Sequence, residues 1–154
     1  MTVYRFSKTI YANDISGTGA KMYGGRWNPA GIPILYTSEH IALGLLEVLA
    51  NAGTLEDLQS LKLAELELPL NPVIEEIKLI NLKKDWWNDF DYTQWLGAEI
   101  FKNSGCLAAK CPSAIVEKQS NYIINPAHAD FKKVKLKIIT DFRFDERLFK
   151  TRQL

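Results

Sequence analysis

One stretch of the chain repeats its apolar residues at the spacing of an α-helix and has signals at both ends. Ser38 has the chemistry of an N-cap, and Glu39 after it suits the positive end of the helix dipole. The apolar residues that follow at helical intervals are Ile41, Leu45, Leu46, Val48 and Leu49. Asn51-Ala52-Gly53 then provides a stop, so the pattern predicts a helix over residues 39–51.

A second helix is expected over residues 93–103. Its apolar residues follow the same period and are Trp95, Leu96, Ile100 and Phe101, and Ser104-Gly105 ends the segment. The preceding residues, 83–92, are aromatic and acidic and predict a short, partly exposed connection. Residues 55–61 fit either a turn of helix or a loop.

Alternating apolar and polar residues, and short β-prone runs, predict strands in the rest of the chain. The expected strands are residues 3–6, 32–37, 62–69, 73–79, 106–109, 113–117, 122–124 and 134–144. In the last of these, lysines alternate with apolar residues, which is typical of an edge strand protected by charge. Residues 13–23 contain glycines and small polar side chains and predict a loop.

The order of these elements indicates the fold class. Strands come first, then one helix, further strands, another helix and a final group of strands, with no internal repeat or linker. This order favours a compact α+β domain over a regular alternation of strand and helix. A length of 154 residues suits one domain, so residues 1–154 are expected to form it, with a C-terminal strand and polar tail over 132–154.

Composition and charge exclude several classes of protein. The sequence is 47% hydrophobic and 24% charged, and 19 basic against 18 acidic residues give a formal net charge of +1. This balance provides no basic face for direct nucleic-acid binding. No apolar run approaches the ~20 residues of a membrane span, and the N-terminus has no signal pattern, so we expect a cytoplasmic protein without membrane contact.

The reactive side chains exclude several kinds of site. Cys106 and Cys111 do not form a C-x-x-C pair and have no histidine cluster nearby, so we expect two reduced thiols and no metal site. His40 and His128 are far apart in sequence, and no serine stands in a G-x-S-x-G turn. Gly17-Thr18-Gly19 lacks the third glycine of a dinucleotide-binding motif, and no P-loop is present.

The stretch Tyr23-Gly24-Gly25-Arg26-Trp27-Asn28-Pro29 has a composition that packing alone does not explain. Its two glycines permit a sharp turn or a close approach to a ligand. The arginine offers a planar fork of donors for phosphate or carboxylate, and the tryptophan adds a flat apolar surface. The asparagine precedes a proline, which favours an extended or turn conformation. The stretch therefore predicts a loop that binds an anionic and flat group.

The remaining candidates for chemistry are dispersed along the chain. They are Arg5, Arg26, Tyr36, Thr37, Ser38, Glu47, Ser113 and Asn125. Each has an ordinary structural interpretation: the arginines suit ion pairs, Tyr36 suits a strand and Ser113 suits a turn. Glu47 falls inside an apolar helical run, so it lies either on the solvent side of the helix or in a pocket beside Arg26. Only their occurrence together favours a functional site.

In combination these residues resemble the RES domain, the toxin half of RES–Xre toxin–antitoxin pairs. The arginine, glutamate and serine after which that family is named correspond here to Arg26, Glu47 and Ser113. Further matches are Tyr4-Arg5, Gly17-Thr18-Gly19-Ala20, Tyr36-Thr37-Ser38 and Asn121-Tyr122-Ile123-Ile124-Asn125-Pro126. The matching motifs span residues 3–131, which is nearly the whole chain.

The resemblance implies a fold similar to that of ADP-ribosyltransferases, with a split mixed sheet, a few flanking helices and a cleft for NAD⁺. It implies growth arrest through consumption of NAD⁺, by cleavage of the nicotinamide–ribose bond with water or inorganic phosphate as acceptor, or ADP-ribosylation of a protein target. NAD⁺ is then a substrate, and no permanent cofactor or metal is expected. The implied partner is an Xre-type antitoxin with a helix-turn-helix, and a homodimer fits general symmetry arguments.

The resemblance also suggests a role for each candidate residue. Arg26, Tyr36, Glu47 and Ser113 are the expected catalytic residues, with Glu47 stabilising positive charge on the ribose. The residues expected to bind NAD⁺ are Arg5, Gly25, Arg26, Trp27, Asn28, Tyr36, Ser38 and Asn125. Two alternatives stay open: the pocket binds a nucleotide without chemistry, or the aromatic stretch 86–95 is a protein interface.

Overall fold

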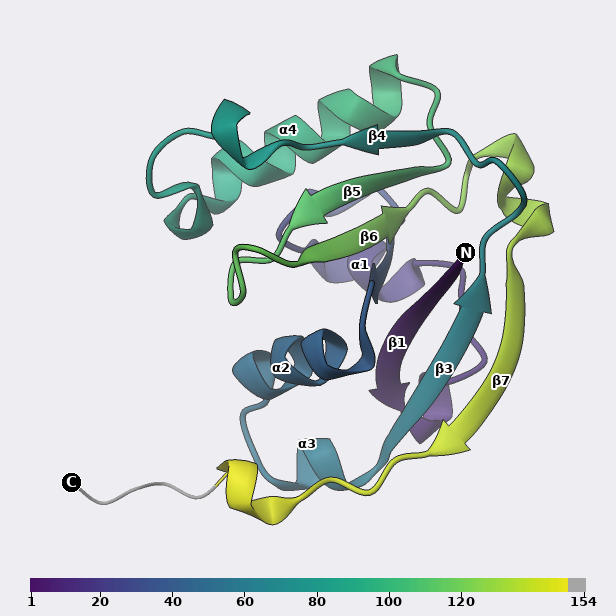
Figure 1. Cartoon of the computed structure of the whole chain (residues 1–154), viewed down its shortest axis with the longest axis vertical. Coiled ribbons are helices and arrows are strands. Elements are labelled where there is room, and N and C mark those ends of the chain that lie inside the picture. The colour runs from purple at the N-terminus through teal and green to yellow at the C-terminus, as the bar shows by residue number, and fades with distance from the viewer. Residues whose placement is uncertain (150–154) are drawn as a thin grey trace.

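A seven-stranded mixed sheet in the order β4-β5-β6-β2-β1-β3-β7 is the framework of the computed structural model, which describes residues 1–149 (Figure 1). Its strands are β1 (Thr2–Lys8), β2 (Leu35–Ser38), β3 (Leu61–Glu67), β4 (Ile74–Glu76), β5 (Ala108–Pro112), β6 (Ser120–Ile124) and β7 (Lys135–Asp141). β4 and β5 are parallel, and the other neighbouring pairs are antiparallel. The expected α+β class with a mixed sheet is confirmed.

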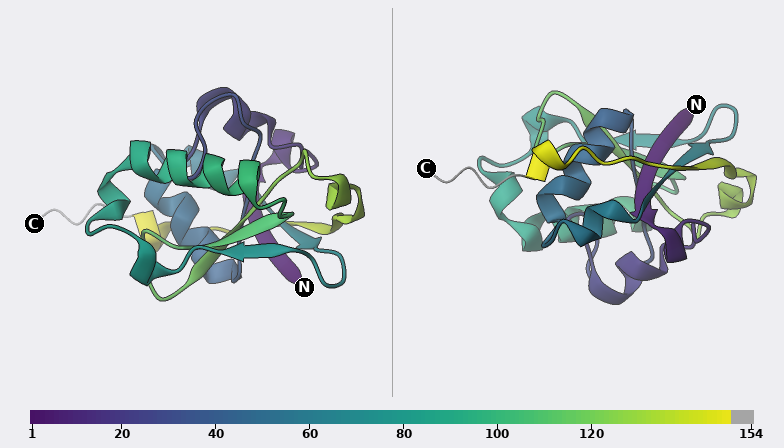
Figure 2. Two further views of the ribbon diagram at one scale, coloured as in Figure 1. Left: turned by 90° about the horizontal axis from the view of Figure 1, so that it is seen from above. Right: turned by 90° about the horizontal axis from the view of Figure 1, so that it is seen from below.

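Among residues 1–149, four α-helices flank the sheet. They are α1 (Thr18–Tyr23), α2 (Ile41–Asn51), α3 (Glu56–Gln59) and α4 (Phe90–Asn103). Short 3-10 turns lie at Thr9–Tyr11, Leu79–Asn81, Trp86–Asn88, Ala129–Lys133 and Glu146–Phe149. α4 connects the parallel strands β4 and β5 and lies along that half of the sheet, whereas α2 and α3 lie beside the half that contains β1 and β3 (Figures 1 and 2). None of these described helices is long and apolar enough to cross a bilayer.

The sheet divides into two halves at the junction of β1 and β2. β1 pairs with β3 along its whole length, but it meets β2 at one register position, Tyr4 with Ser38. Beyond this pair the two strands separate, and Figure 1 shows the halves β4-β5-β6-β2 and β1-β3-β7 inclined to each other. Because no main-chain pairing closes this opening, it is the place in the sheet where a ligand can enter.

Apolar residues from both halves pack into three clusters. The first joins strands of the two halves through Val3, Leu35, Ala64, Leu66, Leu68, Leu107, Ala108, Ile124 and Val134. The second lies beside α4 and contains Trp27, Ile34, Ile77, Trp86, Ala109, Cys111 and Ile123. The third lies beside α2 and α3 and contains Phe6, Leu58, Leu61, Leu63 and Phe144. Leu45, Val48 and Leu49 of α2 pack against this third cluster, which holds the helix next to the split.

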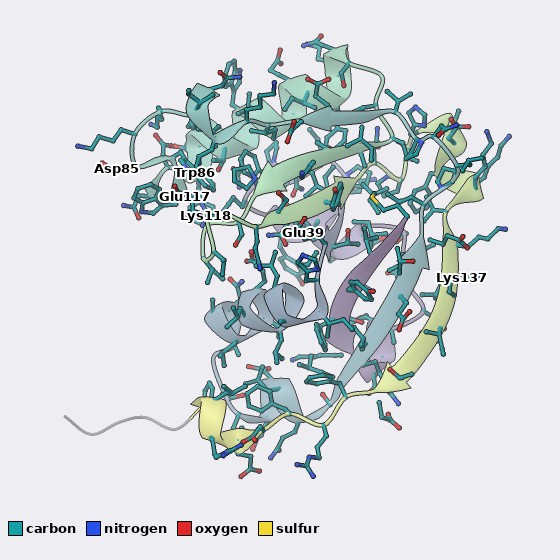
Figure 3. All side chains as sticks on the ribbon, in the orientation of Figure 1. Glu39, Asp85, Trp86, Glu117, Lys118 and Lys137 are labelled. Carbon is teal, nitrogen blue, oxygen red and sulfur yellow. The ribbon has the colours of Figure 1, made fainter. Side chains whose placement is uncertain are left out.

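Most elements expected from the sequence pattern are present. The helix expected over 39–51 is α2, and the strands expected over 62–69 and 134–144 are β3 and β7. β7 is an edge strand, as its lysines predicted, and its Lys137 forms an ion pair of 3.2 Å with Glu67 of β3 (Figure 3). Of the expected polar tail, residues 150–154 lie outside the described part of the chain.

The prediction that Ser38 caps α2 is wrong. Ser38 is the last residue of β2, and His40 occupies the N-cap position without a side-chain hydrogen bond. The Ser38 hydroxyl donates instead to Asn121 Oδ1 at 2.7 Å. Because Ser38 lies opposite Asn121 in the β2–β6 register, the buried side chain finds its partner across the sheet rather than along the chain.

Two segments expected to be irregular contain helix. α1 lies inside the loop expected over 13–23, and Gly24 ends it with a left-handed φ of 74°. The connection expected over 83–92 already includes the first turn of α4. That helix begins early because Asp89 acts as its N-cap, with Oδ1 accepting the Tyr92 N–H at 2.9 Å.

The strand expected over 113–117 is also wrong. β5 runs instead to Pro112, the last residue of the strand, where a missing N–H costs little pairing. The following residues turn back towards β6, and the Ser113 N–H donates to the Gln119 carbonyl at 2.9 Å. Likewise the strand expected over 32–37 begins only at Leu35.

α4 passes very close to the loop that carries Trp27. A Cβ added at Gly97 in the middle of α4 would lie 1.9 Å from the Trp27 carbonyl oxygen. One turn earlier, Gln94 Nε2 donates to the Gly25 carbonyl at 2.8 Å. Glycine at position 97 therefore allows α4 to lie directly against the loop and to support its backbone.

Gly97→Ala is expected to destabilise the fold by about 1–3 kcal/mol, the usual cost of overpacking a filled site, although alanine is the better helix former. Gly19→Ala in α1 is the matched control, because a Cβ there meets nothing within 4 Å. Its expected effect is a gain of about 0.5–1 kcal/mol from propensity alone. Urea unfolding followed by tryptophan fluorescence measures both. Equal stability of Gly97→Ala and the wild type would show that the loop moves away without cost.

Candidate active site

A cavity of about 990 Å³ occupies the split between β1 and β2. Its walls come from β1, β2, α1 and the loop after it, α2, the start of α4, the end of β5 with the turn that follows, and Asn121 of β6. The candidate residues that line it are Arg5, Gly25, Arg26, Trp27, Tyr36, Thr37, Ser38 and Glu47. A volume of this size is typical of a small-molecule site. The split sheet therefore brings most of the residues singled out in the sequence to one place.

The Glu47 side chain points into this site rather than along the solvent side of α2. Its Oε1 accepts hydrogen bonds from Ser113 Oγ at 2.8 Å and from Asn121 Nδ2 at 2.5 Å. Among residues 1–149, no group donates to its Oε2 and no cation lies within ion-pair distance. A partly buried carboxylate needs donors, and here one oxygen has two while the other stays available to a ligand.

Ser113 gives Glu47 a donor of fixed direction. It is fully buried just after β5, and its Oγ accepts the N–H groups of Ile115 and Val116, both at 3.0 Å. Since these two bonds occupy the lone pairs of the hydroxyl oxygen, its hydrogen is left for Glu47. Ser113 therefore orients the carboxylate from behind and does not itself line the cavity.

Asn121, which the sequence analysis did not single out as a site residue, is the second donor to Glu47. It stands on β6, opposite Ser38 of β2 and Cys111 of β5. Asn125, a residue expected to bind NAD⁺, belongs to the same Asn121–Pro126 segment. Only the register of three strands, which the sequence does not specify, shows that Asn121 is the asparagine that reaches Glu47. The available signals were the match of the Asn121–Pro126 segment to the RES domain and the polar start of β6, Ser120-Asn121.

Arg26 is held by the aromatic segment that precedes and begins α4. Its Nη1 donates to the Trp87 carbonyl at 2.7 Å, and its guanidinium carbon lies 4.5 Å from the centre of the Phe90 ring and 5.8 Å from that of Trp86 (labelled in Figure 3). Partial burial lowers the pKa of Arg26, and the charge of Glu47 opposes this shift. The segment expected to be a plain connection thus forms one wall of the site and orients a cation.

Tyr36 and Asn28 lock the loop that carries Arg26. The Tyr36 hydroxyl accepts the Trp27 N–H at 2.9 Å and donates to Asn28 Oδ1 at 2.7 Å. Asn28 Nδ2 donates to three carbonyls of the surrounding loop, those of Ala20, Pro29 and Ile32. A Cβ at Gly25 would lie 2.5 Å from the Tyr36 hydroxyl, so only glycine fits there. The Tyr36 ring lines the cavity, but its hydroxyl is occupied by the lock.

Trp27 was expected to offer a flat surface to a ligand, but the structure buries it. Its side chain is 2% exposed and packs on Trp86, with ring centres 5.6 Å apart. Asn28 is fully buried and does not line the cavity, and neither does Asn125, whose Oδ1 accepts the Ala127 N–H at 2.9 Å. The places of Trp27 and Asn28 favour a role in holding the loop, and Asn125 lies away from the site.

Arg5 provides a second guanidinium from β1. Its Nη1 donates to the Tyr11 carbonyl at 3.3 Å, the one hydrogen bond that its side chain makes among residues 1–149. Burial lowers the pKa of Arg5, and the nearby charge of Asp14 opposes this shift. Arg5 lines the main cavity and also a smaller one of about 120 Å³. Most of its donors therefore remain free for an anionic ligand.

The cysteines offer no nucleophile. Cys106 and Cys111 are both buried and free, as expected. Burial, reinforced by the charge of Glu47, raises the pKa of the Cys111 thiol above its ordinary range. Within residues 1–149, no group of three His, Cys, Asp or Glu side chains is placed to hold a metal ion.

Apart from Lys8 and Asp57, which pair with each other at 2.8 Å, the charged side chains that line the cavity are one carboxylate and two guanidinium groups. Glu47 presents a free oxygen from α2, Arg26 lies on the loop after α1, and Arg5 lies on β1. Tyr36 and Phe90 add aromatic side chains to the lining. Such a site can hold a ligand that carries positive charge at one point and phosphates at another, with flat rings between.

Comparison with known proteins agrees with the resemblance found in the sequence. The sequence matches the family described as RES domain over residues 2–145. A protein named Toxin Res from Photorhabdus laumondii subsp. laumondii is 36% identical, over an alignment that covers 99% of this chain and 100% of the relative. A protein named Prs ADP-ribosylating toxin from Sphingobium sp. is 31% identical, with 94% and 92% covered.

The fold is similar to that of a solved structure described as the M. tuberculosis MbcT–MbcA toxin–antitoxin complex. The TM-score is 0.76 at 19% sequence identity, and the alignment covers 92% of this chain and 83% of that chain. At this identity the likeness concerns the fold.

Tyr36→Phe is expected to reduce the free energy of unfolding by about 1–3 kcal/mol at pH 7, because it leaves the Trp27 N–H and Asn28 Oδ1 buried without a partner. Burial raises the pKa of Tyr36. The hydroxyl's contribution is therefore complete below the unfolded pKa of about 10 and is lost as the pH rises through the folded pKa. Chemical unfolding at pH 7 and above pH 10 should show the difference between variant and wild type shrinking.

The control for this experiment is Tyr11→Phe, since Tyr11 is exposed. It should change stability by less than about 0.5 kcal/mol at pH 7. A Tyr36→Phe protein as stable as the wild type at pH 7 would show that the hydrogen bonds of the Tyr36 hydroxyl do not stabilise the loop.

Proposed function

The chain belongs to the RES domain family, and from this premise we propose that it is the toxin of a toxin–antitoxin pair and an enzyme that consumes NAD⁺ by cleaving the nicotinamide–ribose bond. Loss of NAD⁺ would arrest growth. The observation that carries the proposal is the Glu47 carboxylate, which is held through Oε1 by two neutral donors while Oε2 is left free in a cavity that also contains Arg26.

Glu47 acts on the charge that develops when the bond breaks. Cleavage of the nicotinamide–ribose bond builds positive charge on the ribose, and a nearby carboxylate stabilises an oxocarbenium-like transition state. Its free Oε2 serves this charge directly or through the ribose hydroxyls. Nicotinamide leaves as a neutral molecule, so the reaction needs no strong general acid.

Arg26 and Arg5 bind the phosphates. A guanidinium gives bidentate contact to phosphate oxygens, and Arg26 is already oriented by the Trp87 carbonyl and the Phe90 ring. Arg5 keeps most of its donors free in the lining of the cavity, so it can hold the pyrophosphate or an acceptor phosphate. The Tyr36 ring is the surface on which nicotinamide stacks.

The acceptor for the ADP-ribosyl group defines three versions of the proposal. Water gives hydrolysis, inorganic phosphate gives phosphorolysis, and a protein side chain gives ADP-ribosylation. The named activity of the Sphingobium relative supports the third version, whereas the free donors of Arg5 favour phosphate. The alternative of a nucleotide-binding module without chemistry is tested by the same assays.

The proposed partner is an antitoxin of the Xre type with a helix-turn-helix, acting in the cytoplasm where NAD⁺ is available. The fold likeness to the MbcT–MbcA complex supports an antitoxin partner. Three exposed apolar side chains, Tyr23, Phe90 and Ile115, line the cavity from different elements. Such a rim suits a protein that covers the opening.

Glu47→Gln should lower the rate of nicotinamide release from NAD⁺ roughly 10²–10³-fold, the usual cost of removing one preorganised electrostatic group. The amide oxygen of glutamine can still accept from Ser113 and Asn121, so the fold is expected to survive. Release is followed by chromatography of nicotinamide. Glu99→Gln on α4, outside the cavity lining, makes the same change of charge without loss of rate. A wild-type rate for Glu47→Gln would overturn the assignment.

Reactions with NAD⁺ labelled in its adenosine half identify the acceptor. With the purified protein and inorganic phosphate, the expected product is a phosphorylated ADP-ribose, and without phosphate the rate should fall or ADP-ribose should form. Label that appears only on protein after addition of a cell extract would instead establish ADP-ribosylation. NAD⁺ that binds but is never cleaved under any condition would support the module without chemistry.

A further inference from the structure

Asn121 has a place in the site that none of the family's naming residues explains. We infer that Asn121, held by Ser38, is a positioning residue that keeps Glu47 in one orientation with one oxygen free for the transition state. This inference rests on the proposed function and deepens it, because it adds a second support for the carboxylate beside Ser113.

Chemistry determines which group donates in each of the two hydrogen bonds that link Ser38, Asn121 and Glu47. An ionised carboxylate only accepts, so Asn121 must turn its amide nitrogen to Glu47, at 2.5 Å. Its Oδ1 then faces Ser38, whose hydroxyl must donate, at 2.7 Å. Ser38 is buried and so holds the amide in this orientation. The order Ser38 to Asn121 to Glu47 follows from these requirements.

Both donors act on the same oxygen of Glu47. Ser113 and Asn121 each donate to Oε1, and neither is charged. Had a guanidinium paired with Glu47 instead, much of the negative charge would already be compensated before substrate binds. Two neutral donors stabilise the carboxylate and fix its plane, yet they leave its charge to act on the ribose. Asn121 therefore contributes to orientation without competing for the charge.

Asn121 stands on a strand that is paired on both sides. β6 lies between β2 and β5, so the backbone of Asn121 is paired on both sides, with Ser38 and with Cys111. The Cys111 thiol also lies 3.5 Å from the Asn121 carbonyl oxygen. A group that must hold an angle during a reaction gains precision from such a rigid mount.

Few other ionisable groups act on Glu47. Arg26 faces it from the loop after α1, and the Cys111 thiol faces it from β5, where burial keeps the pKa of the thiol above its ordinary range. Arg5 lines the same cavity from β1. Glu39, before α2, is directed to the Ser120 N–H at 2.7 Å rather than to Glu47 (Figure 3). None of these neighbouring groups gains or loses a proton near pH 7.

Asn121→Asp tests the inference through pH. Aspartate has the shape of asparagine, but it donates to Glu47 only while it is protonated. Two carboxyl groups at this distance cannot both ionise easily and will share a proton at low pH. The ratio of the variant's kcat/KM to that of the wild type should be within about tenfold at pH 5 and should fall about tenfold per pH unit once the shared proton is lost.

Asn103→Asp is the matched control. Asn103 Nδ2 donates to Glu99 Oε2 at 3.0 Å on the exposed face of α4, so the same change again places two carboxylates together, but outside the cavity lining. Its ratio to the wild type should stay constant with pH. An Asn121→Asp enzyme whose ratio to the wild type does not depend on pH, whether it is active or inactive, would overturn the inference.

A second measurement separates this inference from the proposed function. If the wild type releases no nicotinamide, the proposed function fails, and unfolding curves still test the geometry. A shared proton held by the folded Asn121→Asp protein makes its stability fall, relative to the wild type, as the pH rises above about 4, where unfolded carboxyls ionise. If the stability of Asn121→Asp and that of the wild type changed with pH in parallel, the contact between residue 121 and Glu47 would be contradicted.

If Asn121→Asp does not fold at pH 5, the variant Ser38→Ala tests the same inference. It removes the group that orients the amide but leaves Asn121 in place. We expect a lower kcat with an unchanged KM for NAD⁺, because orientation matters in the transition state more than in substrate binding. An unchanged kcat would overturn the role of this hydrogen-bonded chain.

Discussion

The central constraint on the site is that the Glu47 carboxylate is partly removed from water and yet keeps its negative charge. Glu47 meets this need with two neutral donors on one oxygen, and each donor comes from a different strand end. That arrangement requires α2 beside the split, the turn after β5 and the exact register of β6 at the same time. The α+β fold is thus organised around a single negative charge that stays available.

The two cations are held by separate means. Arg26 sits on a loop that is rigid because Tyr36 and Asn28 satisfy its polar groups internally, and because Gly97 lets α4 lie against it. Its guanidinium then rests on the Phe90 ring. Neither cation contacts Glu47 within ion-pair distance among residues 1–149. Glu47 and the two guanidinium groups are therefore kept apart in one cavity, which leaves their charges for the ligand, whereas Lys8 and Asp57 of the same lining pair with each other.

Sequence patterns predicted the parts of this site that depend on neighbouring residues. The helical period located α2, and the combination of Arg26, Glu47 and Ser113 indicated the family. What depends on strand register was not predictable: Ser38 has the chemistry of a cap but pairs across the sheet, and Asn121 is recognisable only once β6 is placed beside β2. The burial of Trp27 was not predictable for a related reason, since it depends on Trp86, far along the chain.

The single pairing between β1 and β2 gives the cavity a mechanical character. Separating two strands costs the hydrogen bonds between them, and this junction, Tyr4 with Ser38, has the shortest register in the sheet. Fewer main-chain hydrogen bonds therefore resist a hinge motion here than at any other strand junction, while α2 packs on both strands and an apolar cluster joins the two halves. Ser38 belongs to this hinge and to the chain that orients Glu47. A widening of the cavity at this junction is therefore coupled to the orientation of the Glu47 carboxylate.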